Sequence, residues 1–173
     1  MGGVKVVIGD RQKKVKLPVG MRLLIRKCCA AVLIAEDFDE RAIVAVSLVD
    51  DEEISFLNGK YRGKDLPTDV LSFPLSEEIG VYDRNPETGE VLLGDIIMSL
   101  ERAERQSVSY GHSFQREVAY LTVHSLLHLF GYTHKEGALK KLRMREKEET
   151  IMTRLGLPGT CSYVVDEFIQ TRR

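Results

Sequence analysis

The sequence predicts an α+β fold, in which a small mixed sheet of about four strands is packed with about five helices. Short apolar runs bounded by turn residues indicate the strands. Longer segments with apolar residues three or four positions apart indicate the helices. The chain has 173 residues, of which 43% are hydrophobic and 29% charged. We therefore expect a single domain over residues 1–173, with a core large enough to need no disulfide staple.

The first half of the chain contains two predicted strands and two predicted helices. Residues 4–8 (Val-Lys-Val-Val-Ile) form the first strand, and residues from about 19 to 36 carry apolar side chains at helical spacing. Residues 42–49 are nearly all apolar, which predicts a second strand buried on both faces of the sheet. The acidic run 50–53 then opens a short helix, because carboxylates are favoured at a helix N-terminus.

Two more strands are predicted at residues 68–74 and 91–98, on either side of a polar excursion. The excursion, residues 76–90, ends in the turn sequence Asn-Pro-Glu-Thr-Gly. Ser99 follows the last strand and is expected to cap a helix that runs to about Ser107. The order of the strands in the sheet does not follow from these patterns.

Two further helices complete the predicted fold. Ser113 is a candidate N-cap for a helix leading into the segment from Val118 to His134, which contains no Asp, Glu, Lys or Arg. That helix is apolar on most of its circumference, so we expect it to be buried. A last helix spans about 136–155, and the chain from about 159 is expected to be a loose tail.

The last helix carries both basic and acidic side chains. Its basic residues are Lys140, Lys141, Arg143, Arg145 and Lys147, and its neighbouring acids are Glu146, Glu148 and Glu149. Interleaved charges of both signs favour a solvated face with ion pairs. An RNA-binding track along this face is the alternative.

Overall charge and cysteine content exclude several classes of protein. The net charge is −1, so any nucleic acid must be bound by a local basic patch. The cysteines Cys28, Cys29 and Cys161 are odd in number and two are adjacent, which is not a disulfide framework. There is no signal-peptide pattern and no apolar run long enough to cross a bilayer. We therefore expect a cytoplasmic protein with no membrane contact.

The most specific pattern is a group of three histidines, His124, His128 and His134, with Gly131 between the last two. Residues four apart lie on one helix face, one turn from each other. A glycine can adopt the left-handed conformation that ends a helix, after which the chain can bring the third imidazole toward the first two. Three neutral nitrogen donors with an open fourth position are the ligands of a catalytic zinc site. Hydrogen bonds to protein groups are the alternative way to satisfy buried imidazoles.

The residue after the first histidine bears on the kind of chemistry. Zinc peptidases with the same histidine spacing carry a glutamate at that position, where it acts as the general base. Here the position is Ser125, and a serine hydroxyl at its ordinary pKa cannot perform that role. The predicted ligand set is therefore present without the proteolytic base, which argues against peptide hydrolysis.

Several blocks of the sequence resemble the YbeY family. The segment His124-Ser-Leu-Leu-His-Leu-Phe-Gly-Tyr-Thr-His134 is similar to the family signature H-G-x-L-H-L-x-G-Y-D-H. Further similar blocks are Leu57-Asn-Gly-Lys-Tyr-Arg62, the segment 67–74 (Pro-Thr-Asp-Val-Leu-Ser-Phe-Pro), and Leu-Gly-Asp at 93–95. They occur in the family's order and span nearly the whole chain. Two departures are Ser125 in place of glycine and Thr133 in place of aspartate.

The resemblance implies a zinc-dependent, single-strand-specific endoribonuclease of ribosomal RNA maturation and late ribosome quality control. It implies that His124, His128 and His134 bind one Zn²⁺ and that Arg62 is the catalytic arginine beside the metal. The partners it implies are single-stranded rRNA regions and the ribosome or ribosomal proteins, while the oligomeric state stays open. A metallopeptidase-like hydrolase and a non-catalytic ribosome assembly factor with a structural zinc remain alternatives.

Four other polar residues have open roles. His112 is either an acid or base near neutral pH or a surface loop histidine. Glu117 lies two helical turns before His124, about 10 Å along the axis, so we interpret it as a helix-start charge. Asp69 and Asp95 are candidates for hydrogen bonds to a ligand imidazole, or plain strand-end caps.

Overall fold

The computed structural model describes residues 2–133 and 137–159. Five strands and five helices occur in these residues, and the expected α+β class is confirmed. In chain order they are β1 (Val4–Asp10), α1 (Met21–Ala35), β2 (Ala42–Val49), α2 (Asp51–Arg62), β3 (Val70–Pro74), β4 (Asp83–Arg84), β5 (Val91–Ser99), α3 (Leu100–Tyr110), α4 (Phe114–Leu129) and α5 (Ala138–Arg154). His134 and the predicted tail beyond Gly159 lie outside the described residues.

The sheet has the order β1-β2-β5-β3, and β4 also pairs with β5. Strands β1, β2 and β5 are parallel, whereas β3 and β4 run antiparallel to β5. We expected about four strands. The fifth, β4, is only two residues long and lies in the polar excursion, where Asp83 pairs with Leu92. Two exposed polar residues carry no apolar alternation, so the sequence pattern could not indicate this strand.

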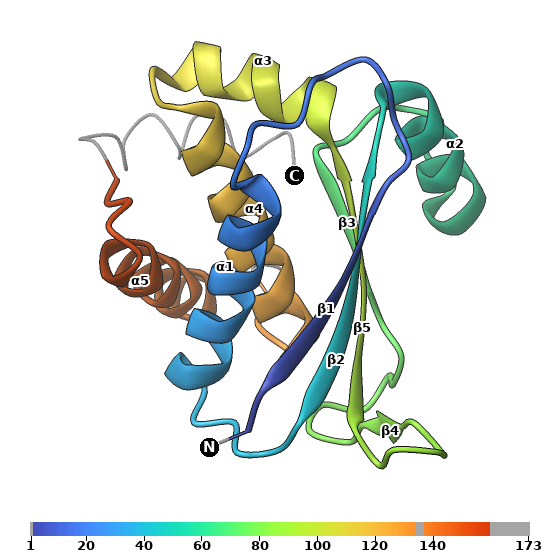
Figure 1. Ribbon diagram of the computed structural model, residues 1–173, viewed down its shortest axis with the longest axis vertical. Coiled ribbons are helices and arrows are strands. Elements are labelled where there is room, and N and C mark those ends of the chain that lie inside the picture. The colour runs from blue at the N-terminus through green and yellow to red at the C-terminus, as the bar shows by residue number, and fades with distance from the viewer. Residues whose placement is uncertain (1, 134–136, 160–173) are drawn as a thin grey trace.

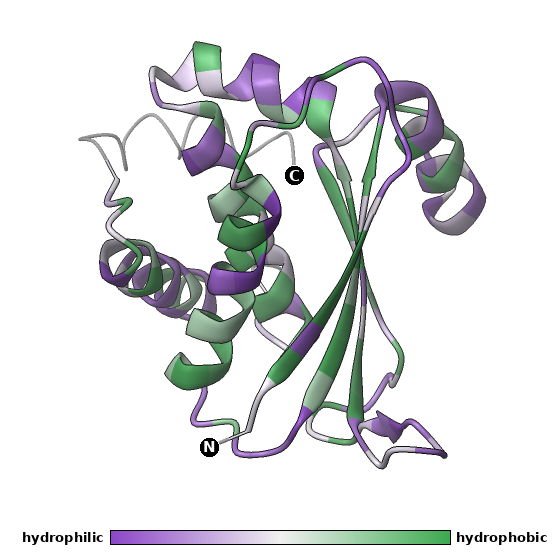
Figure 2. Cartoon of the chain, viewed as in Figure 1, coloured by the Kyte–Doolittle hydropathy of each residue, from purple (hydrophilic) through white to green (hydrophobic). Residues whose placement is uncertain are grey.

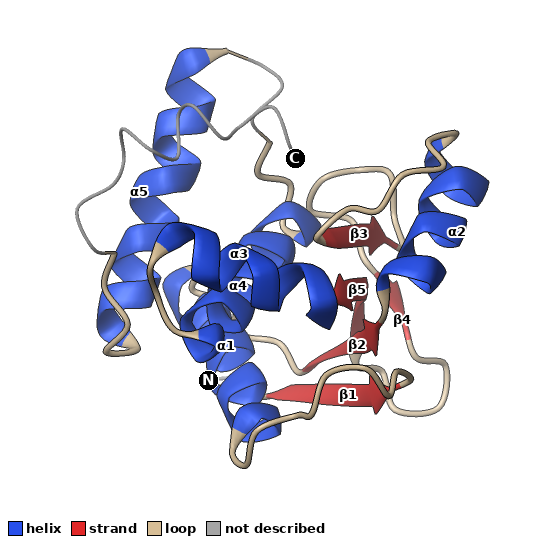
Figure 3. Ribbon diagram, turned by 90° about the horizontal axis from the view of Figure 1, so that it is seen from above, coloured by secondary structure: helices blue, strands red, loops and turns tan. Residues whose placement is uncertain are grey.

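One face of the sheet is covered by α1 and α4, and α2 lies on the other side (Figures 1 and 3). In β2, Ala42, Val44, Val46 and Leu48 are at most 1% exposed, and the residues between them are partly exposed. The expectation that β2 is buried on both faces was therefore wrong. Among the described helices, only α2 packs on the second face, where Val49, Ile54 and Leu71 form a smaller apolar cluster.

Helix α4 lies at the centre of the molecule, because α1, α3, α5, β3 and β5 all contact it. Its N-terminus is capped as predicted, with the Ser113 hydroxyl accepting a hydrogen bond from the Arg116 backbone N–H at 3.1 Å. Gly131 has a φ of 96°, a conformation that favours glycine, and the helix ends just before it. Figure 2 shows the apolar residues concentrated on the strands and inner helices, whereas α2, α3 and α5 carry more hydrophilic ones.

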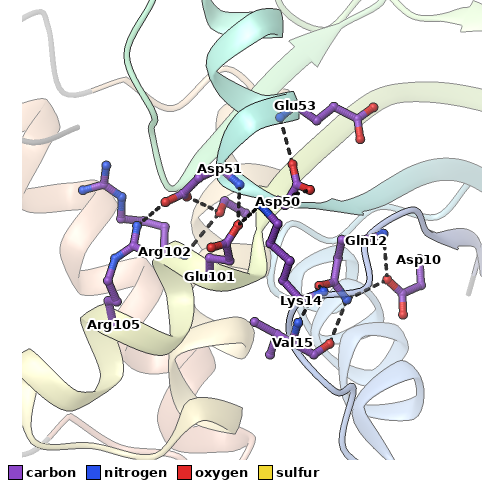
Figure 4. Close-up of polar contacts among 11 residues, drawn as sticks. Asp10, Gln12, Lys14, Val15, Asp50, Asp51, Glu53, Glu101, Arg102 and Arg105 are labelled. Carbon is purple, nitrogen blue, oxygen red and sulfur yellow. Dashed lines mark hydrogen bonds and ion pairs between the residues drawn. The ribbon is translucent and has the colours of Figure 1, made fainter.

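A polar network joins the carboxyl ends of the parallel strands to the starts of α2 and α3 (Figure 4). Asp51 accepts a hydrogen bond from the Ser99 hydroxyl at 2.7 Å and pairs with Arg105. The Glu101 carboxylate accepts from the Asp51 backbone N–H at 3.0 Å, and Lys14 lies 3.9 Å from it. These contacts fix the two helix starts to the sheet edge.

None of the described helices combines the length and the apolar character that a membrane crossing requires.

Candidate metal centre

Two of the three predicted ligands, His124 and His128, face each other on α4. Their ring centroids are 4.5 Å apart, and the two Nε2 atoms are separated by 3.0 Å. His124 is only 4% exposed, while His128 is partly exposed at the end of the helix. The predicted convergence of these two imidazoles is therefore present.

The opposite nitrogen of each ring faces a hydrogen-bond acceptor. His124 Nδ1 lies 2.5 Å from Glu148 Oε1, and His128 Nδ1 lies 2.7 Å from the Tyr132 carbonyl oxygen. An ionised carboxylate and a carbonyl can only accept, so each Nδ1 carries the proton. In neutral rings the two Nε2 atoms are then both lone-pair acceptors, and they face one another. Such a pair is favourable when a cation lies between them.

The geometry fits a metal ion at this point. Tetrahedral zinc with Zn–N bonds of about 2.0–2.1 Å separates its nitrogen ligands by about 3.3 Å, close to the observed spacing. In the described part of the chain, no three His, Cys, Asp or Glu side chains form a group that could hold a metal. The third predicted ligand, His134, is outside that part. The described residues thus supply two nitrogen donors of a candidate site.

Tyr132 connects the candidate site to the neighbouring helices. Its hydroxyl donates to Glu36 at the end of α1, at 3.0 Å, and Lys147 of α5 pairs with the same carboxylate at 3.1 Å. Burial, with the adjacent Glu36 carboxylate, raises the pKa of Tyr132, so its hydroxyl stays protonated as a donor. Tyr132, whose carbonyl accepts from His128, is therefore also held in place by its side chain.

A small pocket of about 80 Å³ adjoins His128. Its walls are Gly131, Leu129 and the loop between β3 and β4, which includes Ile79. A Cβ atom at Gly131 would lie 2.9 Å from Ile79 Cγ2, so the close approach of this loop depends on glycine. The partly exposed imidazole of His128 therefore borders a small cavity beside the loop.

Arg62, the predicted catalytic residue, is the last residue of α2 and is exposed. Its side chain makes no hydrogen bond or ion pair with the described residues, and so none with His124 or His128. Beside it, Lys60 Nζ lies 5.1 Å from the ring centroid of Tyr61, which is 57% exposed. Arg62 thus belongs to an exposed basic and aromatic surface on α2.

Ser125 is completely buried in α4, and its hydroxyl has no hydrogen-bond partner among the described residues. It therefore has no access to a bound substrate. This position therefore does not supply the general base that zinc peptidases carry there, as the sequence predicted.

One sequence interpretation concerning nearby charges was wrong, and another was incomplete. His112 is not a surface loop histidine, because its side chain is 11% exposed and its Nε2 lies 2.6 Å from Glu117 Oε2. Glu117 lies in the first turn of α4, as the helix-start interpretation predicted, and it is also 1% exposed and forms a buried pair with His112. Both groups lie where α3 turns into α4, and sequence spacing alone could not place them together.

The carboxylate that lies against His124 Nδ1 belongs to Glu148 of α5. Asp69 is buried and accepts from the Val70 backbone N–H at 2.8 Å, as a strand-end cap does, while Asp95 is exposed on β5. The residue that sequence reasoning missed is Glu148, which was assigned to a solvated face. A signal was available, because Glu148 shares helical spacing with Met144, Ile151 and Met152, all buried on α5.

The fold and the histidine pair together define a class: an α+β protein that presents a His-x-x-x-His pair on a buried helix, as metal-dependent hydrolases do. Comparison with known proteins identifies the family. The family model described as "Endoribonuclease YbeY" matches residues 7–156. The chain therefore belongs to the YbeY family.

Individual relatives agree with this assignment. The chain is 50% identical over 158 residues to a Caldanaerobacter subterraneus protein named "Endoribonuclease YbeY", with 89% of this chain and 99% of the relative covered. It is 48% identical over 159 residues to a protein of the same name from Thermoanaerobacter pseudethanolicus, with the same coverage. A solution structure of a Thermotoga maritima protein matches with a TM-score of 0.55 and 26% identity, covering 87% of this chain and 91% of that one.

Proposed function

We propose that this chain is a Zn²⁺-dependent endoribonuclease that cuts single-stranded regions of ribosomal RNA during maturation and quality control of the ribosome in the cytoplasm. Membership of the YbeY family supports the endoribonuclease activity, since the relatives carry that name. The single-strand preference, the ribosomal partner and zinc come from the resemblance of the motif blocks.

One observation carries the metal-dependent part of the proposal. His124 and His128 direct their Nε2 atoms at each other across 3.0 Å, while each Nδ1 is occupied by an acceptor. This arrangement leaves both donors turned toward one point. With His134 as the third ligand, all protein donors are neutral, so a bound zinc ion keeps its full charge and supplies Lewis acidity toward a phosphoryl oxygen.

The proposed role of Arg62 is to bind the phosphate group that is being cleaved. Phosphodiester cleavage increases the negative charge around phosphorus, and a guanidinium can bind two of its oxygens through paired N–H groups. Arg62 is exposed and has no ion-pair partner in the described residues, so its donors are available to RNA. The neighbouring Tyr61 ring offers a surface on which a base can stack.

The proposal is tested by metal analysis combined with RNA cleavage. We expect the wild-type protein to retain zinc after dialysis and to cut unpaired segments of rRNA, and His128→Ala to lose both properties. Arg62→Ala is expected to keep its zinc while cleavage falls by about 100-fold or more. Arg26→Ala, an exposed arginine on α1, is the matched control and is expected to behave as wild type.

Two outcomes would contradict the proposal. If His128→Ala keeps full zinc and full cleavage, the metal assignment is wrong. If Arg62→Ala cuts RNA as fast as Arg26→Ala, Arg62 is not part of the catalytic machinery.

A further inference from the structure

A buried carboxylate from α5 reaches the candidate metal centre. Glu148 is 5% exposed, and both of its oxygens are engaged. Oε1 lies 2.5 Å from His124 Nδ1, and Oε2 accepts a hydrogen bond from the Tyr120 hydroxyl at 2.9 Å. Tyr120 precedes His124 by one turn on α4, and its ring lies 5.8 Å from the imidazole. The three side chains thus form one chain of contacts inside the interface between α4 and α5.

Burying the Glu148 carboxylate costs free energy unless specific contacts compensate for it. Met144, Ile151 and Met152 lie on the same face of α5 and are at most 1% exposed. Burying a charged carboxylate among apolar side chains is unfavourable unless it is paired and hydrogen-bonded. An apolar residue would pack there without that penalty. The contacts with His124 and Tyr120 offset it in this protein.

The atom that Glu148 contacts is the informative feature. His124 has two ring nitrogens, and the carboxylate lies against Nδ1, opposite the Nε2 that faces His128. A proton on Nδ1 leaves Nε2 as a lone-pair donor. A carboxylate on the far nitrogen of a ligand imidazole fixes the ring's orientation and raises its basicity. Among the contacts of the described residues, His128 Nδ1 lies against a neutral carbonyl, whereas His124 Nδ1 lies against a carboxylate.

We propose that Glu148 is a positioning residue for metal binding: it holds His124 in the tautomer and rotation that present Nε2 to the ion, and Tyr120 holds the carboxylate in place. This inference rests on the proposed function, because it takes His124 to be a metal ligand. It adds to the site a residue from α5, a helix that lies outside the histidine motif.

The test measures Zn²⁺ affinity of the metal-free full-length protein by competition with a chelating dye, independently of RNA cleavage. Glu148→Gln keeps the side-chain volume but removes the negative charge, and we expect its affinity to fall about 10- to 100-fold. Tyr120→Phe leaves the carboxylate in place without its second hydrogen bond, so we expect a smaller, several-fold loss. Glu146→Gln, an exposed position on the same helix, is the matched control and is expected to retain wild-type affinity.

A second readout separates positioning from a purely structural role. Co²⁺ bound in place of zinc reports the ligand geometry through its visible absorption bands, and we expect these bands to change in Glu148→Gln and to stay unchanged in Glu146→Gln. Wild-type affinity and an unchanged Co²⁺ spectrum in Glu148→Gln would overturn the proposal. If that variant does not fold without metal, Tyr120→Phe decides by the same two measurements.

The failure of this inference is distinguishable from the failure of the proposed function. A wild-type protein that binds no Zn²⁺ and cuts no RNA overturns the proposed function and this inference with it. A wild-type protein that binds Zn²⁺ and cuts RNA, alongside a Glu148→Gln variant of equal affinity, overturns only the role of Glu148.

Discussion

Replacing Ser125 with alanine is expected to stabilise this protein. Ser125 is 0% exposed in α4, and its hydroxyl has no hydrogen-bond partner among the described residues. Leaving such a group buried and unpaired costs about 1–3 kcal/mol. Alanine also has a helix propensity better by up to about 0.7 kcal/mol. Since some packing of the oxygen atom is lost, we expect a net gain of about 1–2 kcal/mol in the free energy of unfolding.

The assay is urea and thermal unfolding of the metal-free protein, so that zinc binding does not contribute. For a chain of this size, each kcal/mol shifts the melting temperature by about 2–4 °C. Ser109→Ala is the matched control, because Ser109 is an exposed serine of α3 and its replacement gains only helix propensity. A gain for Ser125→Ala no larger than that for Ser109→Ala would refute the reasoning from the unpaired hydroxyl.

Three further predictions concern the core and the sheet edge. Gly94→Ala is expected to unfold at lower temperature, with a loss of roughly 3 kcal/mol or more, because its Cβ would lie 2.3 Å from the Phe73 carbonyl oxygen at a φ of 136°. In a Cys161→Ser background, Cys28 and Cys29 are expected to resist Ellman's reagent until the protein is unfolded, because burial raises the pKa of Cys28 to about 12 and that of Cys29 still further. Burial opposes ionisation of Asp51, but hydrogen bonds from Ser99 and Arg105 together lower its pKa. That carboxylate stabilises the folded state above its unfolded pKa of about 3.9 and loses this effect as pH falls through the lower folded value. Asp51→Asn is therefore expected to be less stable than wild type near neutral pH and to approach it in acid, as urea unfolding across the acid range will measure.

The elements with strong local patterns were predictable from sequence. Ser99 and Ser113 are helix caps as expected, because a cap depends on a side chain and a backbone N–H only three residues away. The strand β4 could not be predicted, because its pairing with β5 is decided by the fold and not by its own two residues. The partial exposure of one face of β2 could not be predicted either, because an apolar strand sequence does not reveal how many helices cover the sheet.

The candidate site shows the same division between local and distant determinants. Two imidazoles one helical turn apart must lie close together, so the facing of His124 and His128 follows from the sequence. The buried pair of His112 and Glu117 does not, because it depends on how the turn between α3 and α4 folds back. Glu148 was hidden for a different reason: it is one acid among many on a charged helix, and only its apolar neighbours indicate burial.

The orientation of the two histidines is decided outside the segment that contains them. The turn at Gly131, with a φ of 96°, brings the Tyr132 carbonyl back to His128, and α5 brings the Glu148 carboxylate to His124. Rotating either ring away from its acceptor would turn its Nε2 away from the shared point. The spacing of histidines on α4 therefore supplies the donors, but the direction of the His124 ring requires that α5 be packed in place. Substitutions that loosen α5, such as Met144→Ala in its buried face, are accordingly expected to weaken metal binding although they replace neither histidine.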